Sequence, residues 1–259
     1  MPAVPDYNKY NLTGEKIPLL LGLLNGARSI LINGRNPDID TASVPEDLIP
    51  QGGVYTFQTT AQSLEVLSSS AADAAAGTGA RTILVSGLDA DYREISETVI
   101  LNGVTVVPLT LTYLRVNSVI VVTAGSGLTN AGTITVRVAS GGTTLSVIEI
   151  GFGLAHQGIY TVPADHTLII LSMLSGSSDG TGAANLQLQI RSSIANAAFI
   201  SRMLVAMWGF QTAPSEFGLG IRIAEKSDMR LRVISSPADN TALTLTLSGA
   251  LFRTSDDGL

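Results

Sequence analysis

Two histidines are the first residues of this chain that could take part in catalysis. His156 and His166 lie in a turn-rich stretch, AHQGIYTVPADH, and Asp165 directly precedes the second of them. A histidine backed by a carboxylate acts as a general base when a serine or threonine hydroxyl lies within hydrogen-bonding reach. Nothing in the spacing singles out such a hydroxyl for either ring. We therefore expect both histidines to be turn residues, and we predict that the protein is not an enzyme.

A second candidate is the acidic run DADYREISE, which contains Asp89, Asp91, Glu94 and Glu97. A calcium loop of the EF-hand type needs an oxygen ligand at its fifth position and glycine at its sixth. Arg93 and Glu94 occupy those positions, so the run does not fit such a loop. We expect the two aspartates to shape a turn by bonding their own backbone, and the two glutamates to face solvent or an interface. No metal site is predicted.

Two other patterns suggest ligand binding only weakly. The loop Gly77–Gly79 lacks the lysine and the following helix of a phosphate-binding loop, and a β-rich run follows it instead, so a permissive turn is expected. Trp208, with Met203, Met207 and Phe210, is compatible with a sugar platform, but a lone tryptophan in an apolar run more often belongs to a core or an interface. No cofactor is predicted.

The composition is that of a folded chain with few charges. Hydrophobic residues make up 45% of the 259 residues, and charged residues only 14%. A surface so poor in charge consists mainly of uncharged polar groups, or is partly covered by other subunits. The net charge of −6 does not favour nucleic acid or anionic lipid, and no apolar run reaches the roughly 18 residues of a membrane helix. We expect neither a nucleic-acid nor a membrane partner.

From Gly53 onward, apolar and polar residues alternate with a period of two. The clearest runs are Ile134–Val138, Leu186–Ile190, Met229–Val233 and Leu243–Leu247. Such alternation predicts strands of antiparallel sheets that have one face in a core and one in solvent. We predict an all-β protein, an antiparallel β-sandwich of the jelly-roll kind.

The chain is expected to form either one large sandwich or two consecutive ones over residues 51–140 and 141–259. The glycine-rich stretch Ala139–Thr143 would be the boundary between them, or else the turn of a long hairpin.

Residues 1–50 hold six of the ten prolines, which remove backbone donors and favour an extended chain. We predict that this region is an N-terminal arm. Its apolar side chains need a partner surface, and truncating the arm should weaken attachment to that surface while leaving the sandwich folded. The candidate assembly contacts are Ile17, Leu19, Leu20, Leu23, Leu24, Ile30 and Ile32.

Three segments resemble virion structural proteins of tailed bacteriophages. In chain order they are the loop NGRNPDIDTASVPED at Asn33–Asp47, the loop and strands of Ser68–Gly103, which begin SSSAADAAAGTGAR, and the strand and turn from Glu225 to Thr241. None is a catalytic fingerprint, and the resemblance lies in their ordered combination. It implies a component of the phage particle, on the capsid surface.

The resemblance implies a non-enzymatic virion protein that decorates or cements the capsid, or forms a head fibre, and that assembles in the host cytoplasm. Its partners would be further copies of itself, as a trimer, and the major capsid protein or another virion protein. The alternative is a tail or fibre adhesin that binds host-surface glycan through Trp208 or its loops, although an aromatic content of 5% counts against it. A glycan-cleaving enzyme, which needs two facing carboxylates, ranks last.

Overall fold

The computed structural model describes residues 26–178, 183–194, 197–208 and 213–254. This part of the chain holds sixteen β-strands and no α-helix, and none of its elements is a helix long and apolar enough to cross a membrane. All strand pairings are antiparallel, and the strands form four small sheets. The prediction of an all-β protein with antiparallel sheets is confirmed.

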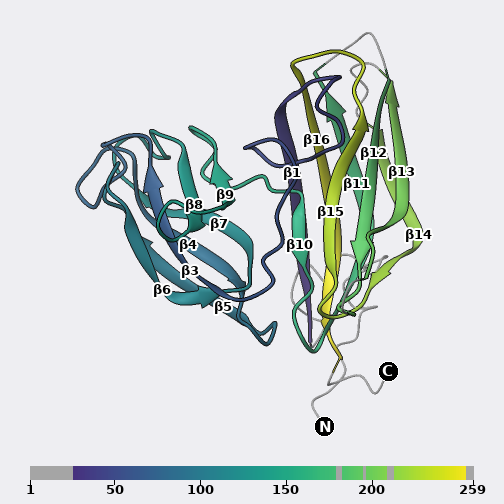
Figure 1. Cartoon of the computed structure of the whole chain (residues 1–259), viewed down its shortest axis with the longest axis horizontal. Helices are drawn as coiled ribbons and strands as arrows, with labels where there is room; N and C mark the ends of the chain where they lie inside the picture. Colours follow the sequence, from purple (N-terminus) through teal and green to yellow (C-terminus); the bar gives the residue numbers. More distant parts are fainter. Residues whose placement is uncertain (1–25, 179–182, 195–196, 209–212, 255–259) are drawn as a thin grey trace, which may run out of the picture.

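The sheets form two lobes that lie side by side, each around its own hydrophobic core (Figure 1). We call residues 26–48 and 159–254 the frame lobe and residues 49–158 the inserted lobe, because the second interrupts the chain of the first. The two lobes are therefore not consecutive along the chain.

The frame lobe has two sheets with a core between them. One sheet has the strand order β1-β16-β11-β14, and the other has the order β10-β15-β12-β13 with the short β2 beside β15. The core takes residues from both sheets. Its strands are β1 (Ala27–Ile39), β2 (Glu46–Asp47), β10 (Ile159–Thr161), β11 (His166–Ser177), β12 (Ala183–Arg191), β13 (Ile200–Trp208), β14 (Ala213–Ile223), β15 (Asp228–Ser235) and β16 (Thr241–Arg253).

The inserted lobe repeats this plan with shorter strands. Its sheets have the orders β6-β3-β8-β9 and β5-β4-β7, and residues of both sheets contribute to a second core. The strands are β3 (Gln62–Ser68), β4 (Ala80–Leu88), β5 (Glu94–Ile100), β6 (Val107–Tyr113), β7 (Arg115–Ala124), β8 (Ile134–Val138) and β9 (Thr144–Ile148).

The period-two runs are strands with their apolar side chains inward. In β16, Leu243, Leu245 and Leu247 are buried, whereas Thr244 and Thr246 between them lie on the outer face. The same holds for β12, where Leu186 to Ile190 alternate with two glutamines. This part of the prediction followed directly from the geometry of a pleated strand.

A buried aspartate organises the loop between β3 and β4. Asp73 is fully buried, and its carboxylate accepts bonds from the amides of Ala80 (2.7 Å), Ala131 and Gly132 (both 2.8 Å) and from the Ser68 hydroxyl (2.6 Å). At Gly77 and Gly79 of this loop, close approach of other atoms and not a left-handed backbone requires glycine. A Cβ on Gly79, for example, would stand 2.1 Å from the Asp73 carboxylate.

The predicted arm is wrong for residues 27–50. Strand β1 pairs with β16 along most of its length, and β2 pairs with β15. Ile32 is 4% exposed in the frame core and Ile30 packs against that core, so these two are core residues and not assembly contacts. Proline did not prevent the strand, because Pro37 lies where the β1 register shifts. The other five predicted contacts, Ile17, Leu19, Leu20, Leu23 and Leu24, lie outside the described residues.

The division of the chain also differs from the two ranges predicted. Ala139–Thr143 is the tight turn of the β8–β9 hairpin, which the Val138 amide closes by donating to Thr143. Of the two alternatives for this stretch, the hairpin is the one observed. A single sequence shows where strands are, but pairing of β1 with β16 across more than two hundred residues leaves no local signal.

Candidate functional site at the junction between the lobes

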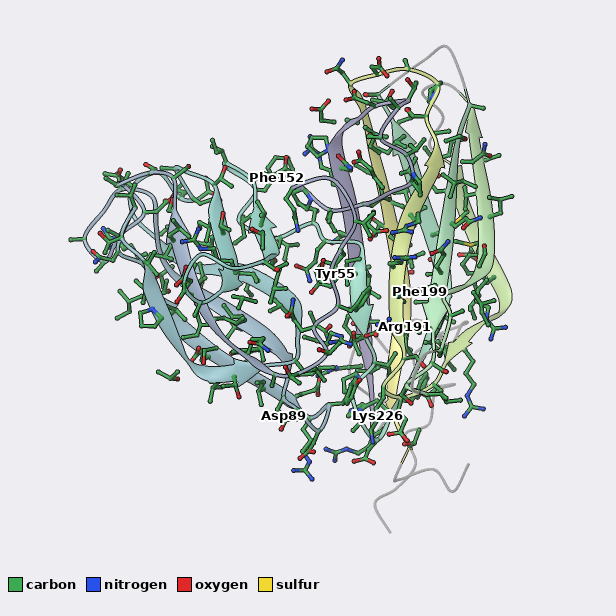
Figure 2. All side chains as sticks on the ribbon, viewed as in Figure 1. Tyr55, Asp89, Phe152, Arg191, Phe199 and Lys226 are labelled. Atoms are coloured by element: carbon green, nitrogen blue, oxygen red, sulfur yellow. The ribbon has the colours of Figure 1, made fainter. Side chains whose placement is uncertain are left out.

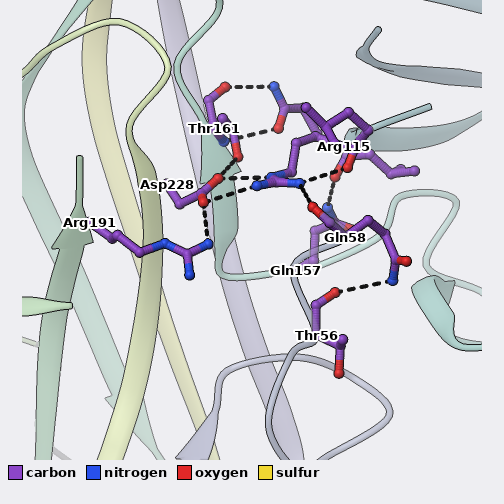
Figure 3. Close-up of polar contacts among 10 residues, drawn as sticks. Thr56, Gln58, Arg115, Gln157, Thr161, Arg191 and Asp228 are labelled. Carbon is purple, nitrogen blue, oxygen red and sulfur yellow. Dashed lines mark hydrogen bonds and ion pairs between the residues drawn. The ribbon is translucent and has the colours of Figure 1, made fainter. Parts of the chain in front are cut away.

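A buried ion-pair network joins the two lobes at Asp228, the first residue of β15 (Figure 3). Arg115, which begins β7 of the inserted lobe, donates from Nε and Nη2 to the two carboxylate oxygens at 2.8 and 3.0 Å. Arg191 of β12 donates to the same carboxylate at 2.5 Å, and the Thr161 hydroxyl does so at 2.6 Å. Arg115 also binds the backbone oxygen of Gln58 at 2.6 Å. The network therefore ties strands of both lobes to one carboxylate.

The electrostatics of this network keep Asp228 ionised. Burial acts to raise the pKa of the carboxyl, but the hydrogen bonds from Arg115, Thr161 and Arg191 outweigh it and hold the pKa below its ordinary value. Arg115 contacts the carboxylate with two hydrogen bonds and Arg191 with one. Charge-assisted bonds of this kind are strong and fix the geometry of the groups. Such a pair orients structural elements, and arginine is too weak an acid to shuttle protons near neutral pH.

Two phenylalanines extend the network into a cluster of guanidinium groups and rings. The Phe57 ring centroid lies 5.2 Å from the guanidinium carbon of Arg115 and 5.0 Å from that of Arg191, and the Phe199 centroid lies 4.7 Å from Arg191 and 4.0 Å from Arg230. The two rings also contact each other, with their centroids 5.4 Å apart. Figure 2 places Arg191 and Phe199 on the frame lobe and Tyr55 between the lobes. Cation–π contacts of this kind are attractive, more so where water is excluded. The contacts of Phe57 with Arg191 and Phe199 add a second set of interactions across the junction.

A second carboxylate, Asp47 of β2, serves the same junction. It accepts a bond from Arg232 at 2.7 Å and one from the Tyr55 amide at 2.8 Å, and Arg230 approaches to 3.9 Å. Burial lowers the pKa of Arg230 to about 10; Asp47 opposes this effect, while the positive charges of Arg232 and Arg191 reinforce it. Asp47 thus fixes the start of the segment that leaves the frame lobe for the inserted lobe.

Beside this network the lobes are separated by a cleft of about 540 Å³. Six consecutive residues of β1, Arg28–Asn33, form one wall, and serines 86, 96 and 118 on the outer face of the β5-β4-β7 sheet lie in the other. Arg28 and Glu94 form an ion pair across it. The lining is rich in hydroxyl and amide groups, so the cleft is polar without a strong net charge.

The two histidines do not come together. His166 begins β11, and its Nδ1 lies 2.7 Å from the Ala164 oxygen in the preceding turn. His156 packs edge-on against Phe152, and burial lowers its pKa, with Glu149 opposing and Arg35 adding to the effect. The carboxylate of Glu149 is engaged by Arg35 instead. Neither ring has a serine or threonine hydroxyl among its contacts in the described chain.

The acidic run forms a turn at the lobe junction. Asp89 accepts bonds from the amides of Asp91 (2.8 Å) and Arg93 (2.9 Å), which is the side-chain-to-backbone turn that was predicted for both aspartates. The Asp91 side chain instead pairs with Arg93 at 3.4 Å. Tyr92 within this turn accepts a bond from the Ala164 amide of the frame lobe at 2.8 Å. No group of acidic or histidine side chains suited to a metal ion occurs among the residues described.

Two remaining motifs are placed by their strands. Trp208 ends β13, where Met207 is buried in the frame core, and Phe210 lies outside the described residues. The stretch Gly176–Gly180 matches the G-x-S-x-G pattern of serine nucleophiles, which the sequence analysis missed. Its Ser178 hydroxyl accepts a bond from the Ala242 amide at 2.9 Å, and the elements on either side are strands rather than a strand and a helix. The serine therefore extends the ladder between β11 and β16.

The sequence analysis did not single out the residues of the junction. Asp228 was noted only as part of a resembling segment, and Arg115, Arg191, Phe57 and Phe199 were not noted. Their separation along the chain is the reason, since Arg115 and Asp228 are 113 positions apart. A charged residue at the first position of an otherwise alternating strand was the only available signal.

Comparison with known proteins gives only distant similarity. No family model matches this chain, and no characterised protein matches it in sequence. The VP2 subviral particle of infectious bursal disease virus is 12% identical over 90% of this chain and 74% of its own, with a TM-score of 0.25. The structure of the Gx strain of that virus is 12% identical over 89% of this chain and 76% of its own, with a TM-score of 0.23. Vicilin of hazelnut (Corylus avellana) is 7% identical over 92% of this chain and 77% of its own, with a TM-score of 0.12. Similarity at this level carries no conclusion about fold or function.

Proposed function

We propose that this chain is a non-enzymatic structural protein of a tailed-bacteriophage virion, which decorates or cements the capsid surface. The observation that carries the proposal is that polar residues of the three phage-like segments are buried and hydrogen-bonded, so they have a structural role. Asn36, Asp73 and Asp228, one from each segment, are all buried. Asn36 donates to Glu46 within its own segment, whereas Asp73 binds the amides of Ala131 and Gly132 and Asp228 binds Arg115, which lie in other parts of the chain. The features shared with phage proteins are thus those that maintain shape.

The strand order of the frame lobe supports the proposal. When β1 and β10 to β16 are counted from one to eight, leaving out the two-residue β2, the sheets read 1-8-3-6 and 2-7-4-5. This order results when one long hairpin is rolled up. In that hairpin strand one pairs with strand eight, two with seven, three with six and four with five. We therefore propose a jelly roll whose first and second strands are separated by the inserted lobe. Jelly rolls form viral shells but also lectins and cupins, so the order is support and not identification.

Apolar side chains on the surface support assembly with other subunits. Leu128, Ile194, Ile150 and Leu204 are each more than 60% exposed. With so little charge elsewhere, such positions favour contact with further copies of the chain and with the major capsid protein. The trimer proposed here rests on the resemblance to phage proteins.

The experiment is to label purified particles of the encoding phage with antibody to this chain and image them by electron microscopy. Label over the heads is expected. Label confined to tails or fibres would replace the proposal by the adhesin, and particles without label would overturn a virion role. Light scattering of the purified chain at tens of micromolar tests the trimer, which a monomer mass would contradict.

A further inference from the structure

Within the described part of the chain, strand β1 has an edge without a partner strand. It is the outermost strand of its sheet there and pairs with β16 alone. The Arg35 amide points away from β16, because it donates to His156 at 3.0 Å, whereas the Gly26 oxygen points toward β16 and accepts from Arg253. Since backbone groups of alternate residues share a direction in an antiparallel strand, those of Ser29, Leu31 and Asn33 point away from β16.

This free edge lies in the cleft between the lobes. The backbone groups of Ser29, Leu31 and Asn33 have no hydrogen-bond partner among the described residues, and Leu31 is 66% exposed. A row of unpaired amides and carbonyls beside an exposed leucine is a template for one more strand. The cleft wall formed by Arg28–Asn33 follows this edge.

We propose that the edge is the docking site of the chain's own residues 19–24, added as an antiparallel strand through a two-residue turn at Asn25-Gly26. Asn-Gly is the most favourable pair for such a turn, which needs a positive φ at its second position. Gly26 has a φ of 70°. The backbone of Gly26, the one turn residue that the structure describes, therefore has the conformation that the proposed turn needs.

The register gives an independent check. A two-residue turn makes Leu24 and Ala27 a hydrogen-bonded pair. The backbone N–H and C=O groups of the odd-numbered residues of β1 must therefore point toward the added strand. The observed bonds of the Arg35 amide to His156 and of the Gly26 oxygen to Arg253 give the odd-numbered residues that same direction. The pairing also places Leu20 opposite the exposed Leu31.

The sequence of the segment suits this place. LLLGLL is apolar at both odd and even positions, as in strands that are covered on both faces. The cleft is mainly polar, but Leu31, Leu154 and Ala155 in its lining offer apolar contacts to this segment. Pro18 would stand opposite Asn33 and has no amide to donate, so the ladder would end there. This inference goes beyond the virion role and replaces the expectation that these leucines bind a neighbouring subunit.

Disulfide trapping in the full chain tests the register, because the chain has no cysteine of its own. The variant Leu20→Cys/Leu31→Cys should form an intrachain disulfide on mild oxidation, seen as a faster band of monomer mass on a non-reducing gel. The control Leu21→Cys/Leu31→Cys places one side chain on the opposite face, beyond disulfide geometry, and should cross-link about tenfold less. Equal yields, no disulfide in either, or a disulfide-linked dimer, which would mean exchange between subunits, would each overturn the proposal.

Hydrogen exchange on the unmodified full chain is the second measurement. The amides of Ser29 and Leu31 should exchange slowly, as should those of Ile30 and Ile32, which point toward β16 and serve as internal controls. Replacing Gly26 by valine disfavours the turn and should accelerate exchange at Ser29 and Leu31 only. Exchange at those two amides in the unmodified chain as fast as at an exposed loop would refute the docked strand.

Discussion

The two lobes have similar two-sheet plans but depend on different interactions. The frame lobe relies on long strands whose alternate side chains fill one core, as in β12 and β16. The inserted lobe has shorter strands, and buried carboxylates hold its loops. Asp73 is one, and Glu65 is another, which accepts from Arg137 at 2.7 Å and from the amides of Ser140 and Gly141 at 3.0 Å. Both lobes have a hydrophobic core, and in the inserted lobe buried carboxylates additionally fix the loops between shorter strands.

The largest effect is expected at Asp73. Asp73→Ala leaves the amides of Ala80, Ala131 and Gly132 without their acceptor, and we expect a loss on the order of 3–6 kcal/mol of unfolding free energy. Asp73→Asn keeps one acceptor oxygen and should lose less. Guanidinium unfolding checks both. A loss below about 1 kcal/mol for the alanine variant would contradict the role given to the carboxylate.

A core truncation in the frame lobe should have a slightly smaller effect. Leu188 is fully buried, and Leu188→Ala is expected to cost about 2–5 kcal/mol through lost burial and a cavity. The matched variant Gln187→Ala, on the outer face of the same strand, should change the free energy of unfolding by less than about 1 kcal/mol. Similar losses for the two variants would mean that β12 does not have one core face.

These two substitutions also mark what the sequence could predict. Leu188 was assigned to the core from its neighbours two positions away, because strand periodicity is a local property. The importance of Asp73 was not predictable in the same way, since two of its partners, Ala131 and Gly132, come from a distant loop. The junction was missed for this reason too. The arm prediction failed because proline content says nothing about β16, the strand that β1 meets.

Acid should weaken the junction before it weakens either core. The folded-state pKa of Asp228 lies below its unfolded value, so its stabilising contribution is complete above about pH 4 and is lost as the pH falls through the folded pKa. Thermal melts between about pH 5 and 2.5 should therefore show a steeper decline for the parent than for Asp228→Asn. Equal declines of the melting temperature in the two proteins would show that Asp228 does not contribute to the loss of stability in acid.

The smallest effect is expected at the surface of the Asp89 turn. Asp91 and Arg93 form an ion pair at 3.4 Å with both side chains at least 70% exposed. Asp91→Ala should change the unfolding free energy by no more than about 0.5 kcal/mol, because solvent screens such pairs. Asp89→Ala, which removes the acceptor of two backbone amides, should cost more in the same unfolding assay. A larger loss for Asp91→Ala than for Asp89→Ala would show that the Asp89 side chain does not stabilise the turn.

The central claim is that the Asp228 network makes one cooperative unit of the two lobes, and scanning calorimetry tests it most directly. The parent protein should unfold in a single transition. Asp228→Ala leaves Arg115 buried without its partner, at a cost of about 3–5 kcal/mol, and should lower the midpoint and split the transition into two. A variant that still unfolds in one transition at the parent's temperature would contradict the claim.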